Sequence, residues 1–187
     1  MGTWQLDPYH TQVEFSAKHL GMMTVRGQFT EISASGDIDP EHPEASSVEA
    51  TISTASVLTN NAIRDNDLRS SNFLDVEKYP TMHFKSTGIT SAGTGADHYT
   101  LTGLLTIKET THPVTLDVTR YGEFNDPGMM GHRIAYGATT AINRKDFGLS
   151  FSMVLDGRFV VSEEIQISIE GEIVEQQEVA AQETASS

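Results

Sequence analysis

Alternation of apolar and polar residues at a spacing of two is the feature that most constrains the fold of this chain. Val13, Phe15 and Ala17 alternate with polar residues, so in a strand they share one face of a sheet. The same alternation recurs in seven further segments, at 25–29, 48–52, 82–84, 99–107, 114–118, 134–138 and 165–169. The pattern predicts about eight strands, each with one buried face.

The connections between these segments are short and rich in turn-forming residues. Such clusters occur at 39–43, 91–95, 125–128 and 156–157. They are too short for helical crossovers, so neighbouring strands should be antiparallel. Several glycines lie in or beside the strands: Gly27, Gly36, Gly103, Gly122, Gly137 and Gly171. Because closing a sheet requires such bends, we expect an all-β, eight-stranded antiparallel β-barrel with one or two short helices, wide enough for one small ligand.

Two segments interrupt the alternation, and a third ends it. Residues 19–24 suggest a single helical turn with the side chains of Met22 and Met23 facing inward. Residues 60–74 suit a short amphipathic helix or an ordered loop that forms a lid or plug. Residues 175–187 are polar and small, and we expect them to form a disordered tail on one domain spanning residues 1–174.

Composition excludes several function classes. The 187 residues include 12 Lys and Arg against 26 Asp and Glu, a net charge of −14, which disfavours binding to nucleic acid. The absence of Cys excludes disulfides, thiolate metal sites and cysteine nucleophiles. The chain has neither a transmembrane run nor a basic and apolar leader, so as written it is expected in the cytoplasm. Removal of a leader would instead give a periplasmic or secreted protein.

Sequence motifs for catalysis and for metal or cofactor binding are absent. The seven His residues form no His-x-x-x-His pair, and the chain contains neither a Gly-x-Ser-x-Gly elbow nor a glycine-rich phosphate loop. We therefore expect no metal, no cofactor and no catalytic residue.

Two charged clusters and two methionine pairs remain as candidate binding elements. The clusters, at 64–69 and 144–148, suit either solvated helices or the polar rim of a cavity, where a guanidinium can bind an anionic headgroup. The pairs Met22-Met23 and Met129-Met130 fall in loops, where flexible methionine side chains suit the entrance of an apolar ligand site.

The order of motifs along residues 3–174 resembles the YceI-like family of lipid- and polyisoprenoid-binding domains. The matching motifs are Trp4-x-Leu6-Asp7-x-x-His10-Thr11-x-Val13-x-Phe15-x-x-x-His19, Val25-x-Gly27-x-Phe29, Ser56-Val57-x-Thr59-Asn60, Arg64-Asp65, Leu68, Phe73, Tyr79-Pro80-x-x-x-Phe84, Gly103-x-Leu105-Thr106-Ile107, Pro113-Val114 and Asn143-Arg144-x-x-Phe147-Gly148. The chain departs from the family at Asp67, where relatives usually have His, and at Glu109, where they often have Gly.

The resemblance implies an extended, lipocalin-like barrel that holds a long isoprenoid-type lipid, such as a polyprenyl phosphate or an isoprenoid quinone, without covalent chemistry. Such a protein would sequester or transport the lipid and would need only transient membrane contact. One apolar residue from each of the eight strands is our candidate for the lining: Phe15, Phe29, Ile52, Phe84, Leu105, Leu116, Tyr136 and Ile167. Five polar residues are our candidates for the headgroup end: His10, His19, Arg64, Asp67 and Arg144.

Two other functions stay open on the residues alone. A barrel enzyme would use His19 with Asp67 or Asp65 as acid and base on a prenyl substrate. A stress or interaction module would have a fully packed barrel and bind its partners on the outside. A homodimer through an outer apolar face is compatible with any of these functions.

Overall fold

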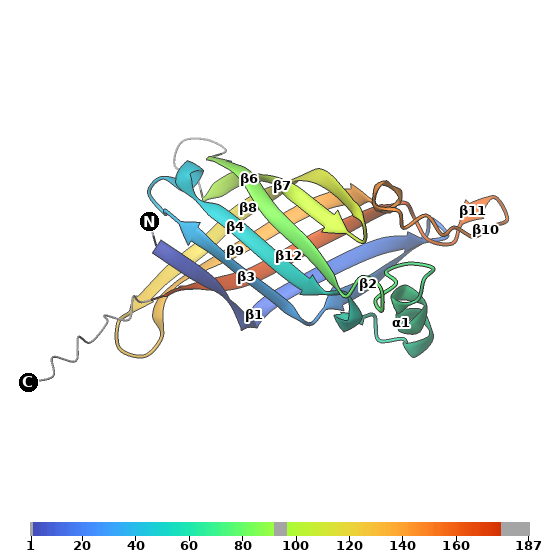
Figure 1. The fold of residues 1–187 in the computed structure, drawn as a ribbon, viewed down its shortest axis with the longest axis horizontal. Helices are drawn as coiled ribbons and strands as arrows, with labels where there is room; N and C mark the ends of the chain where they lie inside the picture. The colour runs from blue at the N-terminus through green and yellow to red at the C-terminus, as the bar shows by residue number, and fades with distance from the viewer. Residues whose placement is uncertain (1, 92–96, 177–187) are drawn as a thin grey trace, which may run out of the picture.

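The wall of the molecule is a closed antiparallel β-barrel (Figure 1). The structure is a computed structural model that describes residues 2–91 and 97–176. The wall strands are β1 (Gly2–His19), β2 (Met23–Phe29), β3 (Ile32–Ile38), β4 (Ser47–Ser53), β6 (Thr81–Ser91), β7 (His98–Ile107), β8 (Thr110–Asp126), β9 (Gly131–Asn143) and β12 (Glu164–Glu175). The shorter elements are η1 (Pro43–Ala45), η2 (Thr54–Ser56), β5 (Val57–Leu58), α1 (Ala62–Arg69), η3 (Arg144–Phe147), β10 (Val154–Leu155) and β11 (Arg158–Phe159).

The barrel closes because β12 pairs with both β9 and β1. The second half of β1 pairs with β2, whereas its first residues pair with β3. β2 and β3 therefore act as one bent strand, and the wall contains eight strands. This confirms the predicted eight-stranded antiparallel barrel. β3 and the first half of β1 are strands that the alternation in the sequence did not predict.

One end of the barrel carries the helix α1 and a hydrophobic plug. The side chain of Asn61 caps α1 by accepting a hydrogen bond from the backbone N–H of Arg64 at 3.0 Å, as capping residues do. This confirms a short helix within residues 60–74. Ile63 on the helix is 85% exposed, whereas Phe73 and Leu74 in the following loop are buried. The buried cluster at this end consists of Val57, Leu74, Met82, Ile107, Ile142 and Phe147.

The prediction for residues 19–24 was wrong. The backbone N–H of Met22 donates to the carbonyl of His19 at 3.0 Å, closing a hairpin turn instead of a helical one. Leu20 and Gly21 have φ of 52° and 70°. This left-handed geometry matches the twist of paired strands and is favoured in two-residue hairpins. Met22 and Met23 are 59% and 68% exposed, so neither is packed inside the barrel, although Met23 lies on the inward-turning face of β2.

Two predictions concern residues outside the described ranges. The predicted turn at 91–95 falls mostly within residues 92–96, and most of the predicted tail falls within residues 177–187. β12 continues to Glu175, one residue beyond the predicted end of the domain. In the described ranges, every helix is too short or too polar to cross a membrane.

Candidate functional site

The inner face of the barrel carries all eight of the predicted lining residues. Phe15 lies two residues from buried Val13, and Tyr136 lies two residues from buried Ile134, so each pair shares a face. Pairing extends the same face across the wall. Phe15 pairs with Ile167, Phe84 pairs with Leu105, and Ile52 pairs with Met82, so these residues share the inner face. Phe29 lies two residues from buried Gly27, and the side chain of Leu116 is itself buried, so both also face inward.

Most of these inner side chains keep partial exposure. Leu116 is 7% exposed, whereas the other seven are only partly buried. Side chains that face the interior from within a strand stay accessible only where space remains beside them, since a filled core buries its residues almost completely. The barrel interior therefore keeps accessible apolar surface beside the plug, against which five of these side chains pack: Phe15, Phe29, Ile52, Leu105 and Ile167.

Two glycines hold aromatic rings against the wall. A Cβ on Gly27 would lie 2.4 Å from the Cζ atom of Phe15, and one on Gly103 would lie 2.3 Å from the Cζ atom of Phe84. Any side chain at either glycine would push the neighbouring ring away, toward the barrel interior. These glycines thus keep two large side chains from filling the interior, a role for strand glycine that depends on close approach.

The α1 end does not present Arg64 as a free binding group. Its guanidinium donates to the Thr59 side-chain oxygen at 2.7 Å and to the Thr59 carbonyl at 2.9 Å. Asp65 beside it is buried and accepts from the backbone and side chain of Thr59. Burial by itself raises the pKa of Asp65, but the hydrogen bonds from Thr59 outweigh it, so the pKa lies below its ordinary value.

Arg144 is 2% exposed and is occupied by the loop that follows η3. Its guanidinium donates to the carbonyls of Ser162 at 3.0 Å and Phe151 at 2.8 Å, and also to the carbonyl of Leu149. Burial lowers the pKa of Arg144. The side chain therefore ties residues 149–162 to the barrel.

The structure does not bring the five predicted headgroup residues together. His10 lies at the end opposite α1, where its Nδ1 is 3.0 Å from Asp7. His19 lies at the α1 end with its Nδ1 3.0 Å from the carbonyl of Val160, and Asp67 accepts from Asn72 at 2.8 Å. Within residues 2–91 and 97–176, no hydrogen bond joins His19 to Asp65 or Asp67.

The end opposite α1 has polar groups inside the barrel that the sequence analysis missed. The Nε2 and Nδ1 atoms of His132 lie 2.5 Å from Glu123 and 2.8 Å from Glu175. The His132 ring meets buried Trp4 edge-on, with centroids 4.8 Å apart. Burial by itself lowers the pKa of His132, but its two carboxylate partners outweigh it and raise the pKa. Burial also raises the pKa of Tyr136 to about 12.

The signal for this cluster was only partly present in the sequence. His132 lies two residues before inward-facing Ile134, so continuing the alternation would have placed it inside. Glu123 reaches the same face because the register of β8 shifts between Arg120 and Gly122. A bulge of this kind changes which residues face inward and leaves no mark in a simple pattern.

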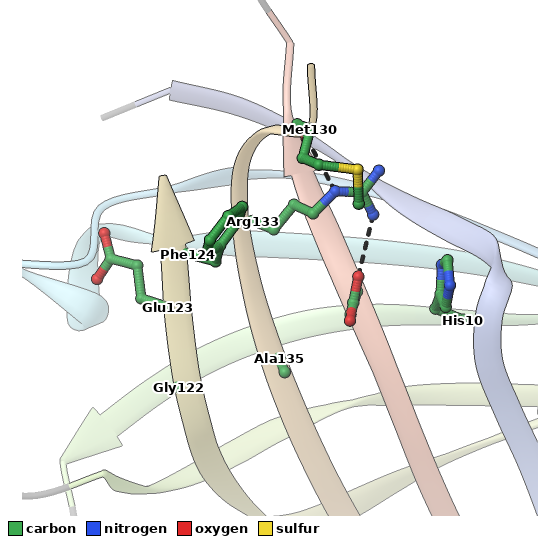
Figure 2. A pocket seen from close by; sticks show the side chains of 8 residues that line it. His10, Gly122, Glu123, Phe124, Met130, Arg133 and Ala135 are labelled. Carbon is green, nitrogen blue, oxygen red and sulfur yellow. Dashed lines mark hydrogen bonds and ion pairs between the residues drawn. The ribbon is translucent and has the colours of Figure 1, made fainter. Parts of the chain in front are cut away.

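A hollow of about 250 Å³ lies on the outer side of the barrel at the same end (Figure 2). Arg133 and Ala135 line it, and they face outward because Ile134 between them is buried inside. The full lining is His10, Gly122, Glu123, Phe124, Met130, Arg133, Ala135 and Glu172. The hollow is smaller than typical sites for drug-sized ligands and does not open on the apolar lining residues.

Arg133 supplies the positive charge in this hollow. It donates to Asp7 at 2.6 Å and to Glu172 at 3.0 Å. Asp7, His10 and Glu172 could between them offer three ligand atoms to a metal ion. However, the guanidinium of Arg133 already bonds to both carboxylates. The hydrogen bonds from Arg133 and then His10 lower the pKa of Asp7 to about 2.

Comparisons with known proteins agree on one family. Residues 4–173 match the family model described as the YceI-like domain. A UPF0312 protein of Pseudomonas paraeruginosa is 38% identical over 162 residues, which cover 87% of this chain and 81% of the relative. The crystal structure of BcnA from Burkholderia cenocepacia has a TM-score of 0.75 at 24% identity, covering 89% of this chain and 98% of BcnA. A polyisoprenoid binding domain from Saccharophagus degradans, implicated in plant cell wall breakdown, has a TM-score of 0.66 at 12% identity, covering 94% of this chain and all of that domain.

Proposed function

Because this chain belongs to the YceI-like family, we propose that it binds a long isoprenoid lipid inside its barrel and sequesters or transports it. The observation that carries the proposal is the partly exposed apolar lining, to which each of the eight wall strands contributes one candidate residue. A chain of isoprene units buried along this lining gains roughly 25 cal/mol per Å² of apolar surface. A polyprenyl phosphate and an isoprenoid quinone both offer such a chain.

The accessible interior favours lipid binding over a packed interaction module. A packed barrel would bury Phe84, Leu105 and Ile167 as completely as the plug buries Phe147. The enzyme hypothesis has less support, since His19 and Asp67 each bond to other groups. The proposed role therefore requires binding and release without a chemical step.

Native mass spectrometry with lipid extraction tests this proposal on the protein purified from its own source. We expect a prenyl lipid at one per chain, and the extracted mass distinguishes a phosphate headgroup from a quinone. An empty protein that also takes up neither added polyprenyl phosphate nor added quinone would refute the proposal.

A matched pair of variants on β9 locates the bound chain. Ala138 faces inward, four residues from buried Ile134, whereas Ala141 is exposed on the outer side. Ala138→Trp fills interior space and is expected to lower lipid occupancy at least about tenfold, because the added ring competes for the same volume. Ala141→Trp adds the same ring outside and should leave occupancy unchanged. Equal occupancy in both variants would place the lipid elsewhere.

A further inference from the structure

Two hairpins lie side by side at the α1 end of the barrel. The first is the β1–β2 turn, and the second joins β10 to β11 through Asp156 and Gly157. The backbone N–H of Leu20 donates to the carbonyl of Val160 at 3.2 Å, which fixes the two hairpins against each other. The β10–β11 hairpin projects beyond the wall at the end opposite the start of β1 and the end of β12 (Figure 1).

Apolar side chains cover the tips of both hairpins. Those at least 45% exposed are Met22, Met23, Met153, Val154, Leu155 and Phe159. Single exposed apolar residues are normal on protein surfaces, but a group on two adjacent projecting turns marks an interaction surface. We call these six residues the apolar tip. All six are exposed and not packed in the barrel interior, although Met23 lies on the face of β2 that turns inward, two residues from Val25.

Unpaired cations flank the apolar tip. Lys18, Arg26 and Arg158 lie beside it and form no ion pair within the described residues. Lys145 lies over the ring of Phe159 and pairs with Glu163 at 2.5 Å. Asp156 contributes one acidic side chain in the hairpin turn itself. The tip is thus apolar at its centre and carries charges of both signs around it, since Asp146, Glu163 and Glu164 lie in the flanking segments.

The cations are unevenly distributed between the two ends of the barrel. Nine of the 12 Lys and Arg residues lie in elements at the α1 end: Lys18, Arg26, Arg64, Arg69, Lys78, Lys108, Arg144, Lys145 and Arg158. The other three, Lys85, Arg120 and Arg133, each form an ion pair with a carboxylate. The same segments at the α1 end also hold nine acidic residues, so the charges there nearly balance, whereas most of the net charge of −14 lies away from α1. The nine are Asp65, Asp67, Asp75, Glu77, Glu109, Asp146, Asp156, Glu163 and Glu164.

We propose that the apolar tip docks the barrel onto the surface of an anionic lipid bilayer. Each Lys or Arg held near an anionic leaflet strengthens binding about fivefold, and apolar tips gain further by entering the headgroup region. Flexible methionine side chains adapt to that irregular layer. The acidic opposite end is repelled from the same leaflet, so the charge distribution sets one orientation.

Flotation of the full chain with lipid vesicles tests this inference. The probes are vesicles of phosphatidylcholine alone and of phosphatidylcholine mixed with phosphatidylglycerol. We expect binding to the mixed vesicles and little to the neutral ones. Met23→Ser with Leu155→Ser removes apolar contact, and Lys18→Glu with Arg158→Glu reverses the flanking charge. Each double variant should weaken binding to mixed vesicles at least about tenfold, and the second should also remove its salt dependence.

A matched control uses exposed apolar residues at the opposite end. Met129 lies in the β8–β9 turn and Tyr9 beside Asp7, and they are 90% and 92% exposed, so Tyr9→Ser with Met129→Ser removes exposed apolar surface away from the tip. This control should bind vesicles as the unmodified chain does. Failure of the unmodified chain to float, or equal losses in the control and the tip variants, would overturn the inference. A dimer in solution that Met23→Ser with Leu155→Ser dissolves, without flotation, would assign the tip to a second copy.

The inference can fail independently of the proposed lipid binding. All of the substituted residues lie outside the barrel, so native mass spectrometry should find the same bound lipid in the tip variants as in the unmodified chain. Vesicle binding by a protein that carries no lipid would uphold the docking surface and refute the proposed cargo. Bound lipid without vesicle binding would uphold the proposed cargo and refute the docking surface.

Discussion

The two ends of the barrel hold their charged side chains in different ways. At the α1 end, buried Arg144 bonds to backbone carbonyls, and the flanking cations Lys18 and Arg158 remain unpaired at the surface. At the opposite end, Arg133 and His132 are both paired with carboxylates. The buried arginine at the first end is thus held by hydrogen bonds that do not titrate near neutral pH, whereas Arg133 and His132 at the second depend on ion pairs that respond to pH.

Replacing one arginine at each end should give the largest difference in the free energy of unfolding between the two ends. Arg144→Met leaves several buried carbonyls without a donor and should lower the free energy of unfolding by about 3 kcal/mol. Arg133→Met removes the partly exposed ion pairs with Asp7 and Glu172 and should cost about 1 kcal/mol. Urea unfolding of both variants measures the two losses. Equal losses would contradict the distinction between the ends.

The Arg144 variant should also loosen one loop selectively. Its guanidinium holds residues 149–162 against the barrel, so Arg144→Met is expected to expose that loop to limited proteolysis before the wall strands open. The Arg133 variant should show no early cleavage there. Cleavage that starts in the wall strands of the Arg144 variant would argue against this role.

Acid should weaken the end opposite α1 through Asp7. Its folded-state pKa of about 2 lies below its ordinary value of 3.8, so its stabilising contribution is complete above about pH 4 and is lost as the pH falls toward 2. After allowance for solvent screening, that contribution is about 1 kcal/mol. Urea unfolding at several pH values should detect it. Asp7→Asn should flatten the curve over this window, and an unchanged curve would refute the assignment.

His132 should produce a smaller effect of opposite sign with pH. Its folded-state pKa is raised, so its contribution is complete below the unfolded pKa near 6.5 and is lost as the pH rises through the folded value. The effect should be smaller than that of Asp7 because both carboxylate partners of His132 are more exposed. Titration of the ring by NMR measures the pKa directly. His132→Gln should remove the corresponding slope in stability, while Asp7→Asn should leave it intact.

The sequence predicted the features that depend on local periodicity. Alternation placed Phe15 and Ile167 on the same face as their strand neighbours, and turn residues marked most of the connections. It could not predict features that depend on partners far along the chain. Nothing near Arg144 indicates that its side chain will bond to the carbonyls of residues 149–162. The register shift after Arg120 likewise brought Glu123 to His132 without a local signal.

The turn at Leu20 offers the smallest expected change in stability at the α1 end. Four other non-glycine residues have positive φ in the described ranges, and three of them are Asn or Asp: Asn60, Asp75, Lys108 and Asp156. Leu20 has a φ of 52° with a bulky side chain, which costs free energy in the left-handed region. Leu20→Asn should therefore stabilise the protein by about 0.5 kcal/mol. Urea unfolding measures this gain.

The same variant separates stability from docking at the α1 end. Leu20 lies between the two hairpins that carry the apolar tip, so replacing it with a polar side chain should weaken vesicle binding slightly while the fold becomes more stable. Asn at position 20 keeps the backbone turn, because Asn tolerates left-handed geometry. A gain in both stability and vesicle binding would mean that membrane contact responds to the rigidity of the hairpin more than to its apolar surface.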